Sequence, residues 1–89
     1  MITEQQLIDN GFTSLGSHSN RTYYSKKHFY LVEHQGQFYR ADVNLESDYE
    51  NPYTDIQDLM NDYNSWLYDV TTSLQKLLEY LTSDDNDEI

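Results

Sequence analysis

The sequence contains no cysteine, a single proline and only three glycines among its 89 residues. Without cysteine, disulfides and thiolate metal sites are excluded, and a reducing cytoplasm is the simplest setting. No apolar run approaches the ~20 residues that a membrane-spanning helix requires, and the residues after Met1 lack the basic and apolar segments of a secretory signal. Nine tyrosines argue that the chain folds despite its charge. We therefore expect one small domain in the cytoplasm of a host cell.

Basic residues are also scarce: five Lys and Arg stand against sixteen Asp and Glu, so the net charge is −11. The imbalance lies in the second half. Residues 1–40 carry a net charge of +1, whereas residues 41–89 hold thirteen acidic residues against Lys76 alone, a net charge of −12. Nucleic acid and anionic membrane would both be repelled by this half. We expect neither as a ligand, and we expect a basic protein as the partner.

The first residues predict a short helix. Thr3 and Gln6 fit a capping box, in which each side chain accepts a hydrogen bond from the backbone of the other. Gly11 fits the left-handed residue that commonly follows the end of a helix. Together these signals place the helix at about residues 3–10.

The segment from residue 22 to residue 43 is rich in Tyr, Phe, Val and Thr, which are typical of strands. The pairs Lys26-Lys27 and Gln35-Gly36 are the expected turns. The segment therefore predicts a three-stranded antiparallel meander at roughly residues 22–25, 28–34 and 37–43.

Both faces of this meander are partly apolar. A two-residue turn at Gln35-Gly36 would pair Val32 with Tyr39 and Tyr30 with Ala41. One face then carries Tyr23, Tyr30, Val32, Tyr39, Ala41 and Val43. The other carries Tyr24, Phe29, Leu31, Phe38 and Arg40. We expect the first face to be the core.

The clearest periodicity follows a second capping box, Thr54 to Gln57. Apolar residues then recur with the spacing 4-3-4-3-4-3-4, which indicates a helix, at Ile56, Met60, Tyr63, Leu67, Val70, Leu74, Leu77 and Leu81. Poor helix formers at residues 70–72 leave two alternatives open, one helix of about 28 residues or two helices with a break. We expect Leu67 and Leu74 to be buried against the sheet.

These elements predict an α+β fold in which the long helical segment packs across one face of the sheet. The predicted domain spans residues 1–82, and residues 83–89 are expected to form an acidic disordered tail. The heptad spacing also permits a coiled-coil homodimer. We favour a monomer, because a three-stranded sheet needs a cover and only this segment is large enough to supply it.

Sequence motifs of catalysis are missing. The chain has no glycine-rich phosphate loop, no His-Glu-x-x-His and no cysteine nucleophile. His28 and His34 lie six residues apart on a predicted strand, about 20 Å, which is too far to share one metal ion. Paired carboxylates can serve acid–base catalysis only in a cleft that raises one pKa. We therefore predict no enzyme activity, no cofactor and no metal.

The acidic residues offer the strongest candidate site. Four aspartates of the predicted helix form a stripe along one side of it, Asp55, Asp58, Asp62 and Asp69. The stripe is about 21 Å long and lies within an arc of roughly 60° around the helix axis. No Lys or Arg lies between residues 55 and 70 to offset them. A solvated helix face would explain the stripe, but ordinary surfaces mix both signs of charge, and interface-prone Tyr and Trp are interleaved here. We predict a partner-binding surface that also includes Asp42, Glu46, Asp48, Tyr49 and Glu50.

A small, cysteine-free, strongly acidic chain with a helix, a meander and an acidic helical region, at residues 3–10, 22–43 and 54–82, resembles inhibitors encoded by phages and other mobile elements. These include anti-CRISPR proteins and the uracil-DNA glycosylase inhibitors. The resemblance is one of layout, without a shared motif. It implies a DNA mimic that occupies the basic surface of a nucleic-acid-binding host protein, such as a nuclease. Two alternatives stay open: an assembly adaptor or homodimer whose acidity only keeps it soluble, and an antitoxin or immunity partner of a basic toxin.

Overall fold

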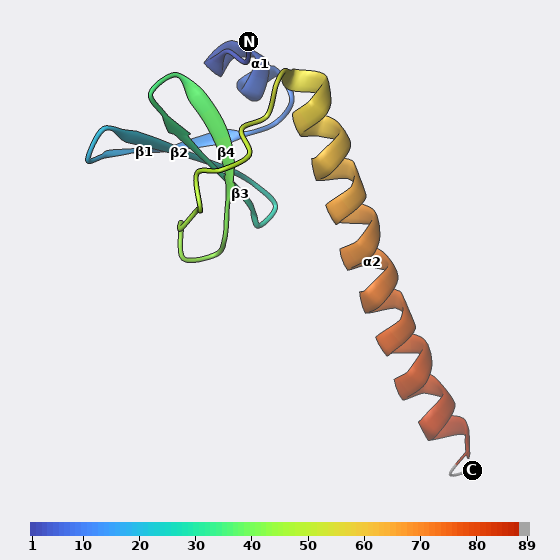
Figure 1. Ribbon diagram of the computed structural model, residues 1–89. Helices are drawn as coiled ribbons and strands as arrows, with labels where there is room; N and C mark the ends of the chain where they lie inside the picture. The colour runs from blue at the N-terminus through green and yellow to red at the C-terminus, as the bar shows by residue number, and fades with distance from the viewer. Residues whose placement is uncertain (88–89) are drawn as a thin grey trace.

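The computed structural model describes the backbone of residues 1–87 and the side chains of residues 1–81. It shows an α+β fold with one antiparallel sheet, whose strands pair in chain order, and a helix on either side of it in the sequence (Figure 1). The elements are α1 (Glu4–Asp9), β1 (Thr13–His18), β2 (Arg21–Lys26), β3 (Phe29–His34), β4 (Gln37–Ala41) and α2 (Ile56–Asp87). The fold class is as predicted, but the sheet has four strands instead of three.

Helix α1 begins with the predicted capping box. The Thr3 hydroxyl accepts a hydrogen bond from the Gln6 N–H (3.2 Å), and the Gln6 side chain accepts one from the Thr3 N–H (3.0 Å). Gly11 follows with φ +90°, which a residue with a Cβ adopts only under strain. The helix contributes Leu7, which is fully buried, to the core.

Strand β1 was missed because its sequence, Thr-Ser-Leu-Gly-Ser-His, lacks the alternation of apolar and polar residues that marks a half-buried strand. All six residues are exposed, so pairing with β2 holds the strand in place. A bulge between Ser14 and Gly16 interrupts the ladder. Bulges and polar side chains are features of edge strands that discourage pairing with other chains.

Tight turns set the register of the sheet. Each of the three hairpins closes with two residues of positive φ, from +52° to +80°, at Ser19-Asn20, Lys27-His28 and Gln35-Gly36. Two consecutive left-handed residues are typical of type I′ turns, whose twist suits a two-residue hairpin. The predicted pairs Val32–Tyr39 and Tyr30–Ala41 are confirmed. The turn between β2 and β3 was predicted at Lys26-Lys27, one residue too early, because Lys26 still belongs to β2.

The larger core lies on the face that we did not expect. Tyr24, Phe29, Leu31 and Phe38 point toward the helices, where they pack with Ile2, Leu7, Phe12, Leu59 and Tyr63. Its rings meet edge to face, with centroids 5.3 Å apart for Phe29–Tyr63 and 6.0 Å apart for Phe12–Tyr63. The expectation that the opposite face is the helix-covered core is therefore wrong. Both faces are apolar, so alternation alone does not choose between them.

The opposite face of the sheet is covered by the loop between β4 and α2 instead of by a helix. Val32, Tyr39 and Ala41 are buried there, with Tyr49 of the loop packed against them. The Tyr49 ring meets the ring of Tyr39 at 5.3 Å and that of His34 at 5.5 Å. The loop is also tied to β4, because the Tyr53 N–H donates to the Phe38 carbonyl (2.9 Å). Val43, which was expected in the core, is 73% exposed.

Helix α2 is one continuous helix of 32 residues, with no break at residues 70–72. Thr71 fits inside it because its hydroxyl donates to the carbonyls of Leu67 (2.8 Å) and Tyr68 (3.1 Å), a local bond that satisfies the side chain within the helix. A helix of this length is about 48 Å long at 1.5 Å per residue. Strands of six residues span only about 20 Å, so α2 extends far past the sheet (Figure 1).

Only the first part of the apolar stripe on α2 is buried. Leu59 and Tyr63 are in the core, and Leu67 is partly buried against it. Leu74 was predicted to be buried but is 56% exposed. It belongs to the second half of α2, which extends past the sheet (Figure 1). The molecule is accordingly elongated, with principal extents of 58 × 25 × 22 Å.

The sequence predicts an acidic disordered tail at residues 83–89. The side chains of these residues and the backbone of residues 88–89 lie outside the described part of the chain, so the tail stays a prediction. Within residues 1–87, neither helix combines the length and the apolar character needed to cross a membrane.

Candidate functional site: an acidic hollow beside the first turns of helix α2

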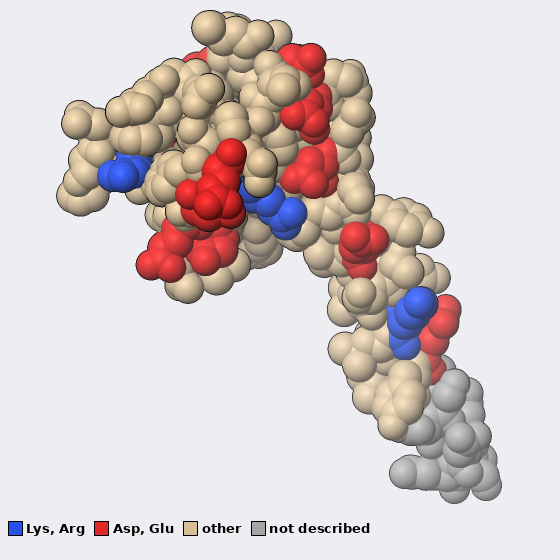
Figure 2. Space-filling view, viewed as in Figure 1, with Lys and Arg blue, Asp and Glu red and all other residues tan. Residues whose placement is uncertain are grey.

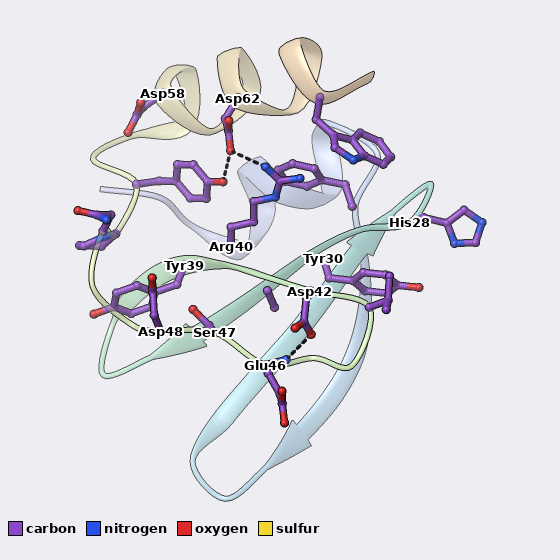
Figure 3. A pocket seen from close by; sticks show the side chains of 17 residues that line it. His28, Tyr30, Tyr39, Arg40, Asp42, Glu46, Ser47, Asp48, Asp58 and Asp62 are labelled. Atoms are coloured by element: carbon purple, nitrogen blue, oxygen red, sulfur yellow. Dashed lines mark hydrogen bonds and ion pairs between the residues drawn. The ribbon is translucent and has the colours of Figure 1, made fainter. Parts of the chain in front are cut away.

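Five of the nine predicted site residues surround one open hollow of about 850 Å³. Its walls are β3, β4, the loop at residues 42–55 and the first turns of α2. The carboxylates on its rim are Asp42, Glu46, Asp48, Asp58 and Asp62. Figure 3 shows Asp58 and Asp62 on α2 and the other three on the loop opposite, with Arg40 between the two groups. We call this feature the acidic hollow.

The loop side of the acidic hollow is folded by its own carboxylates. Asp42 Oδ1 accepts hydrogen bonds from the backbone N–H groups of Asn44 (2.8 Å) and Glu46 (3.0 Å). Asp48 Oδ1 accepts one from the Glu50 N–H (3.1 Å). Such Asx turns are common where a short polar side chain replaces backbone pairing. Asp42 and Asp48 are thus held in fixed positions at the rim.

The helix side depends on an N-terminal cap, although not the predicted one. Asp55 Oδ1 accepts from the Asp58 N–H (2.8 Å), and Asp58 Oδ2 accepts from the Thr54 N–H (3.0 Å). The predicted box of Thr54 with Gln57 is wrong, because Asp55 accepts from the Asp58 N–H and the Asp58 carboxylate accepts from Thr54. A carboxylate in the first turn is also favoured by the helix dipole. Asp55 and Asp58 therefore stabilise the fold whatever they bind.

Asp62 has partners that the sequence did not reveal. The Tyr53 hydroxyl donates to Asp62 Oδ2 (2.5 Å), and Arg40 Nη1 lies 3.8 Å from the same oxygen. The Arg40 guanidinium also lies over the Phe29 ring, 4.8 Å from its centroid. No Lys or Arg lies within residues 55–70, as noted for the stripe. Arg40 of β4 nevertheless places a positive charge beside Asp62. Both members of the ion pair are about half exposed, so its contribution to stability is small.

The other four predicted residues lie elsewhere. Asp55 caps α2 outside the rim, Glu50 and Asp69 are exposed but do not line the hollow, and Tyr49 packs against the opposite face of the sheet. Arg21 lies over the Tyr49 ring, 5.1 Å from its centroid, which further fixes that side chain away from the hollow. The structure therefore gathers part of the predicted surface into one place and gives Tyr49 a packing role.

Electrostatically, the acidic hollow is an anionic surface with one cation. Arg40 is the only Lys or Arg among the residues that line it, against five carboxylates. Figure 2 shows acidic side chains gathered over this loop and along the start of α2. Aromatic side chains, Tyr30 and Trp66 among them, complete the lining. Such a surface attracts cationic side chains and offers rings over which a cation can pack.

No group of three or more His, Cys, Asp or Glu side chains within the described part of the chain is arranged to hold a metal ion. Comparisons with protein-family models, with curated proteins and with solved structures find no match to this chain.

Buried tyrosines make stability at high pH a test of this geometry. Burial and the hydrogen bond to Glu4 (2.8 Å) raise the pKa of Tyr24 to about 12. Burial and the hydrogen bond to Asp62 raise the pKa of Tyr53, and burial raises that of Tyr63. Tyrosine in an unfolded chain titrates near 10. The folded state therefore holds these protons more tightly, and their stabilisation is complete below about pH 10 and is lost as pH rises through their folded pKa values.

We expect tyrosinate absorbance and circular dichroism to show that part of the nine tyrosines ionises only as the protein unfolds above about pH 10. Tyr24→Phe should reduce the amplitude of this late phase, whereas Tyr68→Phe, at a 69% exposed position, is the matched control. Ionisation of all tyrosines while the circular dichroism stays native would contradict the buried positions.

Proposed function

We propose that this chain is a non-enzymatic binding protein that occupies the basic surface of a nucleic-acid-binding host protein, such as a nuclease, in the manner of phage-encoded inhibitors. The observation that carries the proposal is the acidic hollow, where five carboxylates from a loop and a helix converge around a single arginine. A surface that binds phosphates presents Lys and Arg. An array of fixed carboxylates presents the same sign of charge as a nucleic acid and can take its place.

The fixed positions of these carboxylates favour binding. Because Asx turns hold Asp42 and Asp48, little side-chain entropy remains to be lost when a partner's Lys or Arg approaches. Asp62 is only partly neutralised by Arg40, at 3.8 Å. The hollow is also open, which suits the entry of a partner's side chain and not the exclusion of water that carboxylate catalysis requires. These features support a binding role over an enzymatic one.

A second candidate, an assembly adaptor whose acidity only maintains solubility, is favoured by a specific observation. Asp42, Asp48, Asp55 and Asp58 all accept hydrogen bonds from the backbone in turns or at the helix cap. Structural roles therefore explain several of the acids without a partner. The two candidates differ in what happens when rim charges are removed without removing the hydrogen bonds, since only the binding protein loses affinity for a partner.

The test is competition with nucleic acid. The protein would be used as bait in a bacterial lysate treated with nuclease, and the retained protein identified and purified. We expect DNA or RNA to displace this chain from that partner, and we expect the chain itself to bind neither DNA nor RNA at physiological salt. Micromolar affinity for either nucleic acid in a gel shift, or simultaneous binding of chain and nucleic acid to the partner's basic site, would contradict the proposal.

A further inference from the structure

The second half of α2 presents an apolar face that the sheet does not cover. Val70, Leu74, Leu77 and Leu81 continue the same seven-residue pattern whose first half enters the core, and we call these four residues the distal seam. They are 43%, 56%, 53% and 50% exposed, respectively. Tyr80 beside them is 63% exposed. Figure 1 shows this half of α2 extending away from the sheet.

This half of the helix has little to stabilise it alone. Val70, Thr71, Thr72 and Ser73 are poor helix formers, so intrinsic propensity contributes little over these residues. With Tyr80, the distal seam exposes roughly 400–500 Å² of apolar surface, which is in the range of the largest patches on monomeric proteins and usually functional. Packing of the seam against another helix would supply the missing stabilisation.

The distribution of charge allows the second helix to be that of another copy. Between residues 70 and 81 the only charged residues are Lys76 and Glu79, which cancel. Both fall on the side of the helix opposite the seam at 100° per residue. The flanking heptad positions are Thr71, Ser73, Leu78 and Tyr80, all uncharged. Along residues 70–81, two copies can therefore meet without opposing like charges. A basic partner would gain nothing from it.

The spacing of the apolar residues and the area that they expose are both consistent with a second copy packed on the distal seam. Apolar residues at alternating intervals of four and three are the pattern that packs two helices as knobs into holes. Two copies of the distal seam would bury roughly 1,000 Å² in total, the lower limit for a specific interface. At this lower limit of area we expect a weak dimer, with a dissociation constant in the micromolar range.

We propose that this protein forms a homodimer through the distal seam of α2. The interface is separate from the acidic hollow, which lies beside the first turns of the same helix. The two surfaces therefore act independently, and a partner bound at the hollow does not compete with the second copy.

Sedimentation equilibrium of the full chain over the micromolar range tests the proposal. The mass should rise with concentration from 10.6 kDa toward twice that value. In the double variant Leu74→Gln, Leu77→Gln, two exposed leucines become polar residues of good helix propensity. The dissociation constant should rise about 100-fold, with thermal melting at low concentration unchanged.

The matched control, Lys76→Gln with Glu79→Gln, changes two residues on the outer side of the same helix segment and should dimerise as the wild type does. Removal of rim charges at the acidic hollow should also leave the dimer intact, which separates this proposal from the proposed function. A wild-type chain that stays monomeric at every concentration would overturn the proposal. So would a dimer that the two glutamines do not weaken.

Discussion

Replacing Leu59 with alanine is expected to lower the free energy of unfolding by about 2–5 kcal/mol. Leu59 is fully buried where α2 meets the sheet. Truncation removes three buried carbon atoms and leaves a cavity among rings that are already packed edge to face, so the site has little freedom to collapse. Small domains have stabilities of about 5–15 kcal/mol, and one substitution would therefore remove a large share of the total.

Leu74→Ala is the matched comparison, because it makes the same chemical change on the same helix at a side chain that is 56% exposed. Its cost should stay within about 0.5 kcal/mol at concentrations where the chain is monomeric. Both values can be measured by urea denaturation followed by circular dichroism. Equal losses for the two variants would mean that α2 packs differently from the arrangement described, with its second half folded onto the sheet.

Removing three charges from the rim of the acidic hollow is expected to lower affinity for the partner about 1,000-fold or more. The variant is Asp42→Asn, Glu46→Gln, Asp48→Asn. Charge-assisted hydrogen bonds are worth about 1.5–3 kcal/mol each, and three are lost together. The side-chain amide oxygens introduced at positions 42 and 48 can still accept the backbone hydrogen bonds of the two turns, so the loop should keep its shape. The association rate should fall as well and lose much of its salt dependence.

A control with the same net charge separates the rim from the overall field of the molecule. Asp9→Asn, Glu33→Gln and Glu79→Gln also remove three negative charges, but none of these residues lines the acidic hollow. Calorimetric titration against the purified partner should show near-normal affinity for the control. If the rim variant and the control bind equally well, the carboxylates of the hollow serve only the turns, the cap and solubility, and the adaptor candidate is favoured.

Sequence patterns among neighbouring residues were sufficient to predict the elements whose structure depends on neighbouring residues. The capping box at Thr3, the turn at Gln35-Gly36 and the heptad pattern of α2 each depend on residues within a few positions of one another, and each is observed. Strand β1 carries no such signal, because exposed Thr, Ser and Gly residues read equally well as a loop. Its strand character comes from the ladder with β2, which is a property of the pair.

Most of the choices that failed depend on distant residues, although the local box of Thr54 with Gln57 failed as well. The two faces of the meander are both apolar, and what decides between them is where Leu59 and Tyr63 dock and where Tyr49 folds back. The length of the sheet limits how much of α2 is covered, which left Leu74 exposed. At the candidate site, composition predicted nine residues, of which five line the acidic hollow. Arg40 and Tyr53 were not predicted, because their contacts with Asp62 join separate elements.

The unbroken course of α2 through Thr71 has a consequence for valency. One rigid helix separates the acidic hollow from the distal seam, so a pair of chains joined at the seam carries two hollows on a stiff spacer. Two linked sites bind a partner that offers two basic sites at the matching span with an effective concentration set by the spacer, and avidity can exceed the single-site affinity by about 10²–10⁴. A flexible break at residues 70–72 would have allowed many distances between the two acidic hollows, none of them strongly favoured. In the proposed dimer, the continuous helix would instead select one span, and any partner that binds both hollows would need basic sites repeated at that distance.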